Sequence, residues 1–122
     1  MAKISHFREL RVWQGGMERV EQVYRVSGSF PRTEIYGLTS QLSRAAVSVP
    51  SDIREGHTRE STKEYLNHLS IAQASLAEAG TQLEIAQRLG YLGVDELAPL
   101  LEAAAVIGRP LYALRDARNK RK

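Results

Sequence analysis

Cysteine is absent from this chain of 122 residues, and so is any long uninterrupted run of apolar residues. The lack of cysteine excludes disulfides, thiolate metal ligands and cysteine nucleophiles, and it suits a reducing compartment. No apolar run approaches the roughly 20 residues that cross a membrane, and residues 1–6 contain no apolar signal core. We therefore expect a cytoplasmic protein without a membrane partner.

The sequence signatures of common enzymes are missing as well. The chain contains no GxxxxGKS/T, GxGxxG, GxSxG or HExxH motif. It also lacks the two Glu-x-x-His pairs with which a helical bundle holds a di-iron centre. Its histidines are His6, His57 and His68, and we expect His68 to pair with Glu64 one turn away on a helix face. We expect no enzymatic activity, no catalytic residues, no metal site and no cofactor.

The apolar residues that are present follow a helical pattern. They make up 43% of the chain and recur at spacings of three and four, whereas alternation with a period of two is nearly absent. Four stretches show this pattern, at about 8–27, 33–55, 61–89 and 95–117. Because short turns join them, the sequence predicts an all-α fold, an antiparallel up-down-up-down four-helix bundle over residues 1–117. Residues 118–122 would form a basic C-terminal tail.

Local signals predict where these helices start and end. Thr33 and Asp95 are candidate N-caps of the second and fourth helices. Residues 61–64 have the spacing of a capping box at the start of the third helix. Gly56 is placed to end the second helix in the left-handed conformation.

Glycine and proline inside the helices indicate irregular packing. Pro50 predicts a kink in the second helix. Gly15 and Gly16 are unfavourable in a helix interior, so either another backbone comes close there or the helix bends. The spacing of apolar residues predicts a core face of the first helix that consists of Leu10, Trp13, Met17, Val20 and Tyr24.

The fourth helix carries a second apolar stripe beside its core face. This stripe consists of Leu101, Ala105, Gly108 and Tyr112 at spacings of four, three and four. One interpretation is a subunit interface, which hides apolar surface that a single bundle leaves exposed. The other is a broad intramolecular face, which ordinary globular helices also have. The sequence leaves both interpretations open.

The densest polar cluster lies at the predicted corner between the second and third helices. Asp52, Glu55, Gly56 and Arg59 surround this turn. The carboxylates beside His57 have the residue types that acid–base chemistry uses. The simpler interpretation, which we favour, is a structural corner where the carboxylates and the arginine form charge-assisted hydrogen bonds.

Positive charge is concentrated at the C-terminus. Residues 115–122 carry a net charge of +4, while the whole chain carries +3. A basic tail can bind phosphates or acidic partners, although cationic residues also suit the negative end of a helix dipole.

Several linked motifs resemble the small bacterial family of 23S rRNA intervening-sequence proteins, the S23 family. They are FRELRVWQ at 7–14, FPxxExYGLTxQLxRAAxSVPSDIxEG at 30–56, ASLAE at 74–78 and LGYL at 89–92, where x is any residue. The resemblance implies a four-helix bundle, ring-shaped homopentamers and no enzymatic activity. It extends to the accessory variability determinants of diversity-generating retroelements, which are basic pentamers that associate with a reverse transcriptase and nucleic acid. This chain departs from the family in having Asp52-Ile53-Arg54 where the family usually has Asn-Ile-Ala.

Together these observations favour a non-enzymatic oligomeric protein that binds itself as a homopentamer and also binds RNA or a nucleoprotein partner. The alternative is a purely structural protein–protein scaffold that binds no nucleic acid. The candidate nucleic-acid-binding residues are Arg44, Arg54, Arg59, Lys63, Arg118, Lys120, Arg121 and Lys122.

Overall fold

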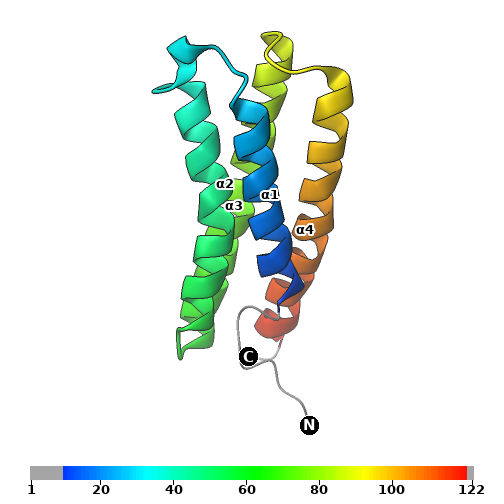
Figure 1. The fold of residues 1–122 in the computed structure, drawn as a ribbon. Coiled ribbons are helices and arrows are strands. Elements are labelled where there is room, and N and C mark those ends of the chain that lie inside the picture. Colours follow the sequence, from blue (N-terminus) through cyan, green and yellow to red (C-terminus); the bar gives the residue numbers. More distant parts are fainter. Residues whose placement is uncertain (1–9, 121–122) are drawn as a thin grey trace.

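The structure, a computed structural model, describes residues 10–120, and in these residues it contains four α-helices and one short 3₁₀ helix. The helices are α1 (Arg11–Ser27), η2 (Arg32–Glu34), α2 (Leu38–His57), α3 (Thr62–Arg88) and α4 (Val94–Lys120). The four long helices lie side by side and alternate in direction (Figure 1). Each packs against its neighbours in sequence, and α4 closes the bundle against α1. The predicted up-down-up-down four-helix bundle is confirmed.

The second helix starts later than the sequence predicts. Residues 32–34 form the 3₁₀ helix, so Thr33 does not cap α2, which begins at Leu38. The Glu34 carboxylate accepts the backbone N–H of Leu38 at 3.0 Å. It thereby satisfies one of the free N–H groups at the start of α2, as an N-cap side chain would. At the other end Gly56 stays helical, and the glycine that adopts a left-handed φ, of 81°, is Gly90 after α3. The expected left-handed closure at Gly56 is therefore wrong.

The starts of the last two helices follow their predicted signals more closely. The Ser61 hydroxyl accepts the Glu64 N–H at 3.0 Å, which confirms the capping interaction. Helix α4 begins at Val94, so Asp95 lies inside the helix and the prediction that it is the N-cap is wrong. The Glu96 carboxylate accepts the backbone N–H of Gly93 at 2.9 Å at this end. At its C-terminal end α4 continues through Lys120, so residues 118–120 prolong the helix instead of forming a separate tail.

The core face of α1 is rotated relative to the prediction. Met17 and Tyr24 are 41% and 56% exposed, and the buried residues are Val12, Gly16, Arg19, Val23 and Ser27. The glycines explain the rotation, because they let α1 approach its neighbours closely. A methyl group at Gly16 would lie 3.3 Å from Cδ of Pro50, and one at Gly15 would lie 3.0 Å from Cγ1 of Ile107. The two glycines therefore mark close helix contacts.

The buried apolar side chains form two clusters. One contains Val23 and Leu100, and the other contains Val12 and Ile107. Arg19 lies between Val12 and Val23 on α1, and it is itself buried. The remaining buried members of the first cluster are Phe30, Leu42, Ala45, Ala46, Ala79, Leu83, Ala86 and Leu92, and those of the second are Val49, Ile53, Tyr65, Leu69, Ala72, Leu76 and Leu111.

Helix α4 is more apolar than a bundle helix needs to be. By length and composition alone, the segment Val94–Ala117 could cross a membrane. Charged residues such as Glu102 and Arg109 interrupt it, so it is not an uninterrupted apolar run. Within this segment the buried residues are Leu100, Ile107 and Leu111. The large apolar side chains of Val94, Val106 and Tyr112 are more than half exposed, so α4 keeps apolar surface outside the core of a single bundle.

The end of the bundle opposite the α2–α3 turn is held by a bond between loops. The Tyr91 hydroxyl donates to Glu34 Oε2 at 2.8 Å, and its ring lies 5.5 Å from that of Phe30. The hydrogen bonds from Leu38 and Tyr91 lower the pKa of Glu34. In turn, the Glu34 carboxylate raises the pKa of Tyr91.

Replacing Tyr91 by Phe tests this bond through its pH dependence. A lowered carboxyl pKa stabilises the fold above the ordinary value of 4.5, and the effect is lost as the pH falls below it. A raised tyrosine pKa stabilises below pH 10, and the effect is lost as the pH rises further. We expect Tyr91→Phe to lower the melting temperature at neutral pH. The difference from wild type should shrink below about pH 4 and above about pH 10. A constant difference across this range would contradict the assignment.

Candidate functional site

A chain of polar side chains connects α2 and α3, and we call it the α2–α3 network. The Ser75 hydroxyl donates to Ser48 Oγ at 2.9 Å, and the Ser48 hydroxyl donates to Asp52 Oδ2 at 2.8 Å. Asp52 Oδ1 lies 3.1 Å from Nδ1 of His68, and Arg59 Nε donates to Nε2 of the same ring at 3.3 Å. The network thus runs from the middle of α3 to the α2–α3 turn.

The donors in the network fix the tautomer of His68. Arg59 Nε always carries a proton, so Nε2 of His68 must accept through its lone pair. A neutral imidazole then carries its proton on Nδ1 and donates it to Asp52. Both ring nitrogens are therefore engaged in holding the two helices together.

This arrangement does not match a nucleophile activated by histidine. Such a site needs a hydroxyl or thiol at the accepting nitrogen, where this structure has a guanidinium N–H. The Ser48 hydroxyl donates to Asp52 instead of to the imidazole. The sequence predicts His57 beside the carboxylates, whereas the histidine in the network is His68. The sequence also predicts that Arg59 bonds to carboxylates, whereas Arg59 donates to the imidazole of His68.

The expected pairing of His68 with Glu64 is also replaced. His68 turns across the interface to Asp52, and Glu55 Oε1 lies 3.9 Å from the same Nδ1. The sequence correctly predicts that this histidine lies beside a carboxylate, but it predicts the wrong carboxylate. The partner lies 16 positions away on another helix, which spacing within one helix cannot reveal.

Asp52, Glu55 and His68 are also the residue types that bind divalent metals, and their donor atoms lie within 4.8 Å of one another. A metal on Nδ1 of His68 would have to displace the proton that Asp52 accepts. It would also favour a proton on Nε2, which faces the N–H of Arg59. The positive charge of Arg59 opposes a cation further. The geometry favours a hydrogen-bonded helix contact over a metal centre.

Gly56 makes this contact possible. A methyl group at its position would lie 2.8 Å from Cβ of His68 and 3.2 Å from Cδ1 of Tyr65. Because Cβ atoms on a helix cannot move without moving the backbone, a side chain at Gly56 would push α2 and α3 apart. The sequence correctly predicts that Gly56 matters at this corner. Its role is to let α2 and α3 approach each other closely, and not to form a turn.

The predicted basic residues do not form one continuous surface. Arg44, Arg54, Arg59 and Lys63 are all exposed, but Arg44 lies ten residues, about 15 Å, up α2 from Arg54. The C-terminal end of α4 lies at the same end of the bundle as the α2–α3 turn (Figure 1). The side chains of Arg118 and Lys120, and the whole of Arg121 and Lys122, lie outside the described residues.

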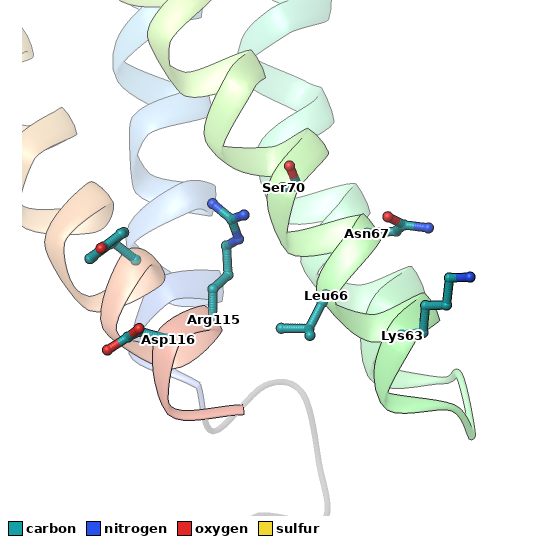
Figure 2. A pocket seen from close by; sticks show the side chains of 7 residues that line it. Lys63, Leu66, Asn67, Ser70, Arg115 and Asp116 are labelled. Carbon is teal, nitrogen blue, oxygen red and sulfur yellow. The ribbon is translucent and has the colours of Figure 1, made fainter. Parts of the chain in front are cut away.

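A groove of about 450 Å³ lies between α3 and α4 near this end. In Figure 2 Leu66 and Arg115 reach into the space between the helices, while Lys63 and Asn67 point away from it. The Arg115 guanidinium donates to Gln73 on α3. Lys63, Asn67, Ser70 and Asp116 line the groove as well, so it is mostly polar, and α3 holds its Arg115 in place.

The predicted second stripe of α4 is divided by the structure. Tyr112 is 58% exposed, and Leu101 and Ala105 are half-buried. Gly108 faces the subunit interior, because a methyl group there would lie 3.4 Å from Leu76 on α3. The largest exposed apolar side chains that the sequence analysis missed on α4 are Val94 and Val106.

The fold and these contacts define a helical-bundle protein in which side-chain bonds across the helices serve packing. Within that class, the family model of the 23S rRNA-intervening sequence proteins matches residues 8–113, and the chain belongs to this family.

One solved structure similar to this chain is that of a protein of unknown function from the S23 ribosomal protein family of Bacteroides thetaiotaomicron. It is 20% identical and superposes with a TM-score of 0.77, covering 85% of this chain and 97% of its own. This likeness supports the fold. Comparison with curated proteins finds no match.

Two alanine substitutions test which carboxylate holds the network. Asp52 is 15% exposed in its side chain and accepts two hydrogen bonds, so Asp52→Ala should lower the free energy of unfolding by about 1–3 kcal/mol. Glu55 is 60% exposed, so Glu55→Ala should change it by less than about 0.5 kcal/mol. Urea denaturation measures both. An equal or larger loss for Glu55→Ala would overturn this ranking.

Proposed function

We propose that the protein is a non-enzymatic homo-oligomer, a pentamer, whose subunits meet through α4. The observation that carries this proposal is the exposure of three large apolar side chains on α4, Val94 at 64%, Val106 at 63% and Tyr112 at 58%. Exposed apolar side chains that gather on one helix mark a candidate association surface. The pentameric state is the one that the family resemblance implies.

The charges and contacts of α4 favour another subunit over a lipid bilayer as the covering surface. Glu102 and Arg109 lie in the middle of the helix and are exposed. Arg109 alone would cost about 2.5–3.5 kcal/mol at the centre of a membrane span. Moreover, Leu100, Ile107 and Leu111 are buried in the bundle core, so α4 cannot leave for a membrane without opening the fold.

Light scattering on a sizing column tests the assembly. We expect a particle of about 68 kDa, five times the 13.6 kDa of one chain. Tyr112→Glu should reduce this mass to that of smaller species, because it places a charge on the proposed interface, while circular dichroism stays helical. Ile71→Glu is the matched control, since Ile71 is similarly exposed, at 49%, but lies on α3. A wild-type monomer at micromolar concentration, with or without phospholipid vesicles, would refute the proposal.

We also propose that the basic end of the bundle binds RNA. Its support is the position of Arg54, Arg59 and Lys63 at the same end as the C-terminus of α4. A pentamer would bring together five copies of this end and of the basic residues that follow it. Nearby acidic residues weaken the surface on α2 and α3, so we assign the larger share of binding to the last five residues. These acidic residues are Glu55, Glu60 and Glu64.

Neutralising the four basic residues at 118–122 tests RNA binding without shortening α4. Changing Arg118, Lys120, Arg121 and Lys122 to Gln takes the net charge of the chain from +3 to −1. Affinity for single-stranded RNA falls with salt by a slope of roughly 0.7 per phosphate contact. We therefore expect the variant to bind weakly and with a flatter slope in fluorescence anisotropy.

The control neutralises three exposed arginines, Arg25, Arg32 and Arg88, which lie at the opposite end of the bundle. This variant should bind RNA much as wild type does. No binding by the wild-type protein at about 50 mM salt would reject RNA as a ligand. The protein–protein scaffold would then be the better interpretation.

A further inference from the structure

The most unusual side chain inside the bundle is Arg19. It is 2% exposed, and its three guanidinium nitrogens have no hydrogen-bond partner among the residues that the structure describes. Every other fully buried large side chain of the described core is apolar. Arg19 separates the two apolar clusters, with Val12 and Ile107 on one side and Val23 and Leu100 on the other.

An isolated buried guanidinium is costly. Moving a charged group out of water costs several kcal/mol unless an opposite charge and hydrogen bonds compensate it. Burial lowers the pKa of Arg19, yet arginine remains protonated in proteins at neutral pH. The fold therefore holds a cation with unused donors in its interior.

A cavity of about 240 Å³ lies beside this cation, between α1 and α4. It is far larger than the roughly 10–15 Å³ that holds one water. Arg19 and Gln22 line it from α1, and Gln22 Oε1 is also buried without a donor among the described residues. Ala103, Val106 and Ile107 form its apolar wall.

We propose that this cavity is a binding site for a small oxyanion, either inorganic phosphate or the carboxylate of a small molecule. The guanidinium nitrogens of Arg19 are closed to solvent in this structure, so in this proposal the side chain turns toward the cavity when the anion binds. The planar guanidinium then matches two oxygens of the anion at once. The Gln22 amide, whose orientation no donor in the described structure fixes, turns its N–H₂ group to the anion. The apolar wall on α4 keeps the local dielectric low and so strengthens the ion pair.

Glu18 limits the affinity of this site. Its carboxylate is exposed and lines the same cavity, so it repels an entering anion. It is also the charge that could swing inward and pair with Arg19 in place of a ligand. The variant Glu18→Gln separates these two roles, because it removes repulsion in the first case and a partner in the second.

Thermal melting of the full-length protein in sodium phosphate, sodium acetate and sodium chloride of matched ionic strength tests the proposal. We expect the Tm of wild type to rise by roughly 5–10 °C once phosphate or acetate exceeds its Kd a hundredfold. The rise in Arg19→Met should be no more than the general salting effect of the anion. Arg109→Met, which removes an exposed arginine of α4, should keep the wild-type rise. A response to phosphate alone or to acetate alone identifies the source of the oxyanion.

Glu18→Gln should respond at lower anion concentration than wild type, and by at least as many degrees. The proposal is overturned if wild type and Arg19→Met respond equally to the anions. It is also overturned if Glu18→Gln melts well below wild type and only this variant gains from phosphate, because Glu18 is then the native partner. Loss of the oligomer in Arg19→Met, with no anion response in wild type, would instead assign Arg19 to a carboxylate of a second subunit.

Discussion

The close approach of α2 and α3 at Gly56 is the constraint on which the rest of the bundle depends. The absence of a side chain there brings Cβ of His68 and the ring of Tyr65 against the α2 backbone. At this separation Asp52 reaches His68 with an unbridged hydrogen bond of 3.1 Å. The two helices also share the most extensive contact in the fold. A bulkier residue would disturb the packing and the polar network together.

The same device recurs on the other side of the bundle. Gly15 and Gly16 bring α1 close to Ile107 of α4 and Pro50 of α2. Arg19 follows one turn later, where the apolar core is interrupted. The α2–α3 network and Arg19 differ in their hydrogen bonding. Each side chain of the α2–α3 network is hydrogen-bonded to the next, and these bonds hold the two helices together. Arg19 has no hydrogen-bond partner among the described residues, which is why we propose an anion from outside the chain as its partner.

Helix α4 is the helix through which we propose that the subunits associate. Leu100, Ile107 and Leu111 anchor it in the core, while Val94, Val106 and Tyr112 are more than half exposed. It also forms one wall of the cavity beside Arg19 through Val106. This exposed apolar surface is the physical reason for the association of subunits that we propose.

The sequence by itself determined the helices, their number and their order, because apolar spacing, a capping box at residues 61–64 and short turns are local properties of the chain. It also located the corner at Asp52 and Gly56. Only the tertiary structure decided which face of each helix is buried, since Val12 and Val23 replace Met17 and Tyr24 once glycine permits close packing.

The hydrogen-bond partners and the burial of polar side chains also could not be predicted from the sequence. His68 meets Asp52 across a helix interface, and Arg19 lies inside the bundle although its residue type predicts the surface. Spacing along a helix reports neighbours three and four positions away, and these contacts depend on how two helices are placed against each other.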